Sequence, residues 1–96
     1  MQAILSALSI ELNIKKVYHE MGYSVDAGVE ILAKQAHGKT YLLTVNSDRK
    51  PVRVSLLGLD AYQKATVLKE NRFISITNGE LVDDFEPFGV HVYELE

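Results

Sequence analysis

The sequence predicts an all-β domain, a two-layer antiparallel β-sandwich of about seven strands with a short N-terminal segment that is helical or extended. From residue 29 onward, short runs of alternating apolar and polar residues are separated by turn residues, about every 8–12 positions. This region has no segment with helical spacing of the kind that alternates with strands in a parallel sheet. The 96 residues fit one domain.

The first three strands are predicted from alternation between polar turns. The clearest is the third, in which Val52, Val54 and Leu56 alternate with Arg53 and Ser55. Such a pattern is typical of a strand with one buried and one wet face. The turns between these strands are rich in Gly, Asn, Ser and Asp, which bond their own backbone or tolerate turn geometry. The predicted ranges are 29–34, 41–45 and 52–56.

Four further strands follow in the second half of the chain. Asn78-Gly79 predicts a tight hairpin, because both positions tolerate positive φ. The predicted ranges are 65–69, 72–77, 81–85 and 90–95. Along these strands and the third one, the residues expected to be mostly buried are Val52, Val54, Ile74, Ile76, Val90 and Val92.

The first 27 residues are predicted to be an N-terminal segment and linker ahead of a sandwich at 28–96. Within 3–16, Leu5, Leu8 and Leu12 have helical spacing, whereas the apolar positions from Leu8 to Ile14 alternate as in a strand. Good helix formers at the start favour a helix, and the extended alternative stays open. We expect the apolar residues to be covered by the sandwich or in a homodimer; they are Ile4, Leu5, Leu8 and Leu12.

Composition excludes several classes of function. The net charge is −3 without a basic stripe, so nucleic acid is not an expected partner. No apolar run reaches the roughly 20 residues that cross a bilayer, and the start lacks the cationic region of a signal peptide, so no membrane partner is expected. The chain has no cysteine, which removes disulfides and thiolate metal sites but leaves the compartment open, cytoplasmic or exported.

The second half of the chain carries recognisable motifs. Residues 38–46, GKTYLLTVN, resemble a "G-K-x-Y-x-x-x-V-N" strand, and Pro51-Val52-Arg53-Val54 resembles the "P-V-x-V" strand that follows it. Residues 85–93, FEPFGVHVY, resemble an "F-x-P-Y-x-V-H-V-Y" close, after an Asn78-Gly79 hairpin with Asp83 or Asp84 and Phe85. Over residues 28–96 the chain is similar to the C-terminal β-sandwich accessory domain of glycoside hydrolases that have a TIM-barrel catalytic domain.

This resemblance implies a non-catalytic domain that packs against a catalytic barrel and stabilises it. The partner would be the barrel of the same polypeptide or enzyme, and the first 27 residues would be a remnant of that preceding domain. Two alternatives stay open. A carbohydrate-binding module would show a line of exposed tyrosines on one sheet. A free-standing immunoglobulin-like interaction domain would show an apolar patch or an exposed edge strand.

The chain itself offers no expected catalytic, cofactor or metal residue. Asp83 and Asp84 are adjacent on a predicted strand, so they point to opposite faces and cannot flank one glycosidic bond. The three histidines have no ligand-like spacing. The candidate sugar contacts are tyrosines outside the clear strands: Tyr18, Tyr23 and Tyr62.

Overall fold

The computed structural model describes residues 8–19 and 24–96, which form nine strands and no helix. Seven of these strands lie where the alternation predicts them, and two more lie in the N-terminal segment. The strands are β1 (Leu8–Ile10), β2 (Lys15–His19), β3 (Val29–Ala36), β4 (Lys39–Asn46), β5 (Val52–Leu57), β6 (Lys64–Val67), β7 (Arg72–Ser75), β8 (Glu80–Phe85) and β9 (Val90–Leu95).

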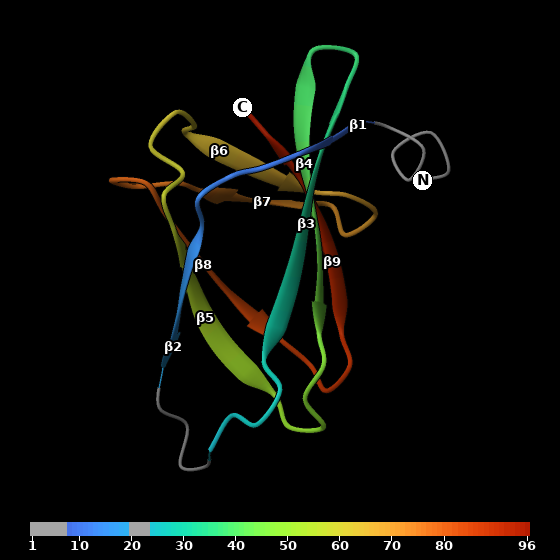
Figure 1. The fold of residues 1–96 in the computed structure, drawn as a ribbon, viewed down its shortest axis with the longest axis vertical. Coiled ribbons are helices and arrows are strands. Elements are labelled where there is room, and N and C mark those ends of the chain that lie inside the picture. The colour runs from blue at the N-terminus through green and yellow to red at the C-terminus, as the bar shows by residue number, and fades with distance from the viewer. Residues whose placement is uncertain (1–7, 20–23) are drawn as a thin grey trace.

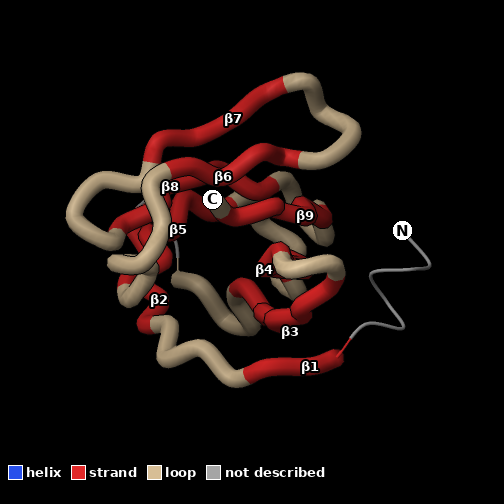
Figure 2. The backbone as a smooth tube through the Cα atoms, turned by 90° about the horizontal axis from the view of Figure 1, so that it is seen from above, coloured by secondary structure: helices blue, strands red, loops and turns tan. Residues whose placement is uncertain are grey.

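The strands form two antiparallel sheets that pack face to face, so the predicted all-β sandwich is confirmed (Figure 1). The larger sheet has six strands in the order β1-β3-β4-β9-β6-β7, and the smaller has three in the order β2-β5-β8. Seen from above, the chain crosses from β1 in one layer to β2 in the other (Figure 2). The first segment therefore contributes an edge strand to each sheet.

The helix favoured for residues 3–16 is wrong over the described part of that range. Leu8–Ile10 pairs with β3, and Lys15–His19 pairs with β5 along its whole length. Both sheets offer an open edge to this segment, and pairing there overrides a weak helix propensity. The strand-like alternation is what places Ile10, Leu12 and Ile14 partly buried against the core. Residues 1–7 lie outside the described part of the chain.

The expected cover over the N-terminal apolar residues is only partly found. Leu12 packs against the core, but Leu8 is 71% exposed in the single chain. Ile4 and Leu5 fall outside the described residues.

The core lies between the two sheets and is built from the inward faces of β3, β4, β5, β8 and β9. Its largest fully buried side chains include Tyr93, Phe85, Leu42, Leu56 and Leu81. Of the six predicted core residues, Val52, Val54, Ile76 and Val92 are buried and Ile74 is partly buried.

Val90 and Val92 are the exceptions among the predicted core residues, because both lie on the outer face of the sheet, where Val90 is 60% exposed and Val92 is buried without joining the core cluster. In β9 it is Tyr93 and Leu95 that enter the core, whereas Val90 pairs with Val45 on the other face of the sheet. Because β9 is apolar on both faces, alternation alone could not identify the inward one.

The Asn78-Gly79 hairpin is confirmed. Both residues have positive φ, 52° and 76°, and Thr77 bridges Glu80 across them. This two-residue turn leads into β8, whose residues then pair in register with β5.

A buried polar cluster fixes three loops at one end of the sandwich. Asn46 is fully buried, and its side-chain amide donates to the carbonyls of Lys50 at 2.9 Å and Glu86 at 3.0 Å. Its side-chain oxygen accepts the Asp48 N–H at 3.0 Å. The Asp48 carboxylate in turn accepts the N–H of Asp26 at 2.7 Å. The β2–β3, β4–β5 and β8–β9 connections are thus held by two adjacent side chains.

Gly28 allows the chain to turn into β3 beside Tyr18. Its φ is 80°, and a Cβ there would lie 2.3 Å from the Tyr18 hydroxyl oxygen. That hydroxyl accepts the Val29 N–H at 2.8 Å. A side chain at residue 28 would therefore displace the tyrosine that ties β2 to β3.

Asn46→Ala is expected to lower the free energy of unfolding by about 2–4 kcal/mol, because it leaves two part-buried carbonyls and the Asp48 N–H without their partner. Urea unfolding followed by far-UV circular dichroism measures the change. The control is Ser47→Ala, which removes only an exposed hydrogen bond to Glu30 and should stay within about 0.5 kcal/mol of wild type. Equal effects of the two substitutions would contradict the central role of Asn46.

Candidate functional site

The outer face of the larger sheet carries apolar residues where a solvated sheet would carry polar ones. The strand register places Leu32, Leu43 and Val92 in one row across β3, β4 and β9. Val45 and Val90 form a second row beside it. We call these five residues the outer apolar patch. It lies on the side of the sheet that faces away from the core.

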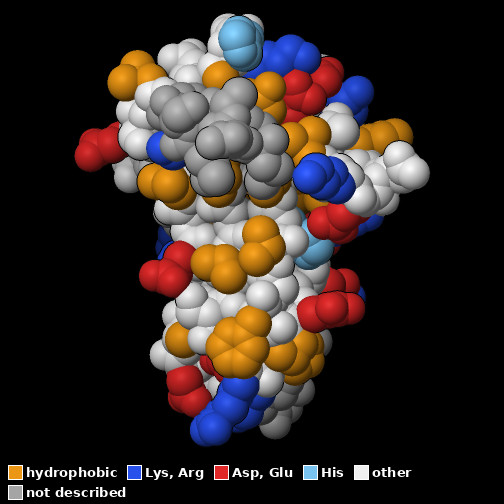
Figure 3. Space-filling model, turned by 90° about the vertical axis from the view of Figure 1, so that its right-hand side faces the viewer, with side chains coloured by type: hydrophobic (Ala, Val, Ile, Leu, Met, Phe, Trp, Pro, Cys, Tyr) orange, Lys and Arg blue, Asp and Glu red, His pale blue; other side chains and the backbone are white. Residues whose placement is uncertain are grey.

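Several members of the outer apolar patch are open to solvent. Leu32 is 47% exposed and Val90 is 60% exposed, whereas Leu43 and Val45 are half-buried. Figure 3 looks onto this side of the molecule and shows hydrophobic side chains gathered in the middle of it, with charged side chains towards its margins. An apolar area rimmed by charges on a sheet face is typical of a docking surface.

The outer apolar patch is hollowed. A shallow groove of about 440 Å³ runs over it, lined by the five patch residues together with Glu30, Ile31 and Thr44. Glu30 is the one ionisable residue of this lining. The groove can therefore accept apolar side chains of a partner at little cost in desolvated charge.

A charged cluster closes the opposite side of the sandwich, between β7, β8 and β9. Arg72 donates from both terminal nitrogens to the two carboxylate oxygens of Asp83, at 3.1 and 2.9 Å. The Tyr93 hydroxyl donates to the same carboxylate at 2.6 Å. Arg72 also donates to Glu70 at 2.9 Å. A bidentate guanidinium–carboxylate pair of this kind holds its two strands in a fixed geometry.

His91 extends this cluster to the edge of β8. One ring nitrogen contacts the Glu70 carboxylate, and the other lies 3.0 Å from the carbonyl oxygen of Asp84. The ring packs on Phe85 with a centroid separation of 4.6 Å. His91 is thus a structural residue held on three sides, with only 14% of its side chain exposed.

The cluster shifts the ionisation of its members. Burial alone would raise the pKa of Asp83, but hydrogen bonds from Arg72 and Tyr93 outweigh it and lower that pKa. The pKa of Glu70 is lowered in the same way, by His91 and Arg72 against burial. The pKa of Tyr93 is raised, first by burial and then by its bond to Asp83. Both carboxylates are therefore held ionised as structural ion-pair partners.

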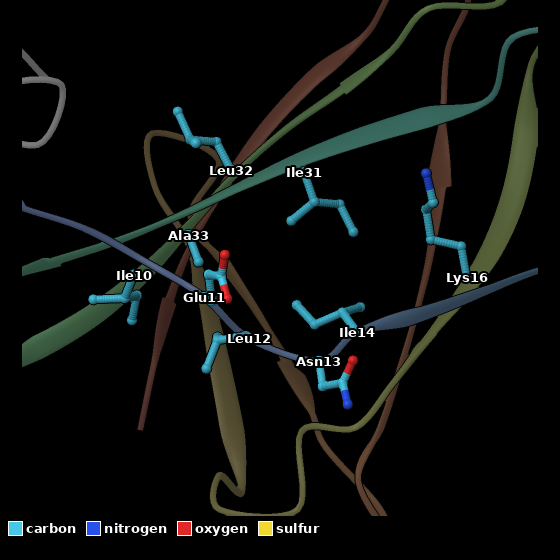
Figure 4. Close-up of a pocket in the computed structure, with 9 residues that line it drawn as sticks. All are labelled: Ile10, Glu11, Leu12, Asn13, Ile14, Lys16, Ile31, Leu32 and Ala33. Atoms are coloured by element: carbon cyan, nitrogen blue, oxygen red, sulfur yellow. The ribbon is translucent and has the colours of Figure 1, made fainter.

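A third feature is a cavity on the open side of the sandwich, beneath the crossing from β1 to β2. It has a volume of about 730 Å³. Figure 4 shows Ile14 and Ile31 projecting into it from opposite walls, while Lys16 reaches from β2 towards β3. The Lys16 ammonium donates to the Val29 carbonyl at 2.6 Å. The remaining lining residues are Ile10, Glu11, Leu12, Asn13, Leu32 and Ala33.

The predicted sugar contacts do not gather in one place. Tyr18 and Tyr62 are partly buried against the core, and their hydroxyls bond the Val29 N–H and the Thr40 hydroxyl. Tyr23 lies outside the described residues. The other described tyrosines are Tyr41, which is half-buried, and Tyr93, which is fully buried. Within the described chain, no line of exposed tyrosines forms a stacking platform.

The carboxylates expected to be structural are each engaged. Asp83 points inward to Arg72, and Asp84 points outward to Arg53 at 2.7 Å, so the predicted opposite orientation is confirmed. His37 occupies the β3–β4 turn with φ 54°. No group of three His, Asp or Glu side chains in the described residues is placed to hold a metal ion.

Sequence reasoning missed the outer apolar patch, although a signal was present. Leu42 and Leu43 are consecutive, as are Ile31 and Leu32, and a strand with consecutive apolar residues is apolar on both faces. Alternation identifies one buried face of a strand, and it does not show that the other face is apolar as well. The Arg72–Asp83 pair had no comparable signal, because its partners are 11 residues apart on different sheets.

Comparisons of the chain with protein-family models, with curated proteins and with solved structures find no match. In the described residues, no helix could cross a membrane.

Asp83→Asn is expected to lower the free energy of unfolding at about pH 7 by about 2 kcal/mol, because it breaks the charge pair with Arg72. The native pKa of Asp83 is below its unfolded value of about 3.9, so its contribution is present above that value and is lost as the pH falls through the native pKa. The stability gap between the two proteins should therefore narrow on acidification to about pH 2–3, as urea unfolding would measure.

Asp84→Asn is the control for this substitution, because Asp84 pairs with Arg53 on the exposed face. It should cost much less than Asp83→Asn at neutral pH. A gap between wild type and Asp83→Asn that stays constant or widens in acid would contradict the assignment.

Proposed function

We propose that this chain is a non-catalytic β-sandwich domain that docks on a larger partner through its outer apolar patch. The observation that carries the proposal is the exposure of Leu32 and Val90 in one groove with three further apolar residues. Covering this surface removes apolar area from water, which stabilises an interface at roughly 25 cal/mol per Å² before the costs of association. A domain that acted alone, without a partner on this face, would have no physical reason to keep the face apolar.

The partner we propose is the catalytic barrel of a carbohydrate-active enzyme, a glycoside hydrolase. The resemblance of residues 38–54 and 78–93 to the accessory domain of such enzymes supports this choice. In that arrangement the domain stabilises the barrel, and the acid/base chemistry belongs to the barrel. The engagement of Asp83, Asp84 and Glu70 in ion pairs agrees with a structural role for the acids of this chain.

The outer apolar patch favours a docking role over sugar binding. A carbohydrate-binding surface uses flat exposed aromatic rings, and the described tyrosines are all at least partly buried. Of the described residues, the exposed phenylalanines are Phe73 in β7 and Phe88 in the β8–β9 turn, and neither lines the groove. An aliphatic groove is suited to the aliphatic side chains of another protein.

The proposal is tested by expressing the tagged chain in the cells that encode it and recovering it under native conditions. The recovered material should hydrolyse one or more members of a panel of aryl glycosides. The chain purified alone from a foreign host should hydrolyse none. Recovery without associated hydrolase activity, or turnover by the isolated chain, would overturn the proposal.

A double substitution, Leu32→Lys with Val90→Lys, is expected to abolish the associated hydrolase activity, because two charges would be buried in the interface. Both residues are exposed in the free domain, so its unfolding midpoint in urea should change little. The matched control is Val82→Lys, which places the same charge on an exposed apolar residue of the other sheet. Loss of activity with the control as well would show that the outer apolar patch is not the docking surface.

A further inference from the structure

The two edges of the three-stranded sheet are treated differently by the rest of the molecule. The β8 edge is covered: His91 reaches the Asp84 carbonyl, and Arg72 holds the Asp83 side chain. Natural sandwiches cover an edge in this way because its free N–H and C=O groups would otherwise recruit another strand.

Among the described residues no side chain reaches the outer backbone edge of β2, although Lys16 and Tyr18 of this strand bond the Val29 backbone across the sheets. β2 is the terminal strand of the order β2-β5-β8, so β5 is its one strand partner there. In an antiparallel pair, every second residue directs its N–H and C=O away from the partner strand. Lys15, Val17 and His19 are exposed on the outer side of β2. The strand is therefore paired along one edge and open along the other.

The cavity of about 730 Å³ lies beside this open edge, at the start of β2. Its walls include Ile14 from the approach to β2 and Ile31 and Ala33 from β3 in the facing sheet (Figure 4). These side chains belong to the interior of the sandwich, but the three-stranded sheet is too narrow to cover the whole inner face of the six-stranded sheet. A further strand beside β2 would direct alternate side chains into this space.

Charge selects what kind of strand fits. β2 carries Lys15 and Lys16 and no acidic residue. Two copies paired antiparallel about Lys16 would place Lys16 opposite the partner's Lys16, and pairing about Val17 would place Lys15 opposite the partner's His19. Like charges directly opposite destabilise a strand pair. These two registers therefore disfavour a second copy, and Lys15 favours an acidic strand at the edge of the cavity, whose lining includes one acidic residue, Glu11.

We propose that the open edge of β2 binds an extended segment of a different polypeptide, in which acidic and apolar residues alternate. The apolar side chains enter the cavity between Ile14 and Ile31, and the acidic side chains lie beside Lys15. Backbone hydrogen bonds to β2 supply the remaining affinity, as in other cases of strand addition. The strand edge of this site is on the smaller sheet, and its cavity shares Leu32 with the outer apolar patch. The proposal does not rest on the docking role proposed for that patch.

The test is an NMR titration of the full chain with a short capped peptide of alternating glutamate and valine, against a matched peptide of alternating lysine and valine. The acidic peptide should bind about tenfold tighter or better and slow amide exchange in β2. Equal binding of the two peptides, binding of neither, or shifts confined to β8 or β9 would overturn the proposal. A dimer of the chain would also overturn the proposal, if light scattering without peptide shows that it forms with rising concentration and amide exchange shows that it protects β2.

Two substitutions, with one control, distinguish the contribution of the Lys15 charge to peptide binding from that of the cavity. Lys15→Glu should reverse the preference between the peptides, whereas Lys69→Glu, the same charge change in the turn after β6, should leave it unchanged. Ala33→Val fills part of the cavity and should weaken the acidic peptide several-fold while leaving the charge preference intact. Unfolding in urea confirms that each variant is folded. If Lys15→Glu and Lys69→Glu behave alike, the edge is not the binding site.

Discussion

Asn46 and Asp48 hold one end of the sandwich together, and the register of both sheets depends on them. Asn46 ends β4 in the larger sheet, yet its amide fixes the carbonyls that precede β5 and follow β8 in the smaller one. Asp48 gathers the loop that leads into β3. A one-residue slip in any of these strands would leave a buried polar group without a partner, at a cost comparable to a large share of the stability of a small domain.

Agreement between local sequence pattern and turn residues determines which parts of the fold could be predicted from the sequence. Strands β3 to β9 are short, alternate clearly and are bounded by turn residues, so local pattern and turn chemistry agree. The N-terminal strands could not be predicted, because Leu8 to Ile14 fits helix and strand spacing alike. The outcome depends on open sheet edges formed by residues more than 20 positions later in the chain. The Asn78-Gly79 turn could be predicted because its backbone conformation is a local property.

The candidate sites could be predicted from the sequence less well than the strands, because they depend on contacts between residues distant in the chain. Tyr18 and Tyr62 fell outside the predicted strands, but their hydroxyls satisfy backbone and side-chain groups that the fold brings to them. Whether a tyrosine offers an exposed ring for stacking or makes a structural hydrogen bond depends on partners distant in sequence. The outer apolar patch shows the opposite case. Leu43 and Val90 were visible as apolar residues, but their exposure depends on which face of each strand turns to the core.

The two sides of the sandwich are closed by different kinds of interaction, and this difference determines where each can bind. On the β8 side, the Arg72–Asp83 ion pair joins the two sheets, and His91 fills the space beside it with a ring nitrogen 3.0 Å from the Asp84 carbonyl oxygen. A partner there would have to displace charges already satisfied, which is costly. On the β2 side, Lys16 and Tyr18 span the sheets with one hydrogen bond each to the Val29 backbone, and the walls of the adjoining cavity are largely aliphatic. The chain can therefore accept new backbone and apolar contacts at β2 without losing an ion pair that holds its sheets together.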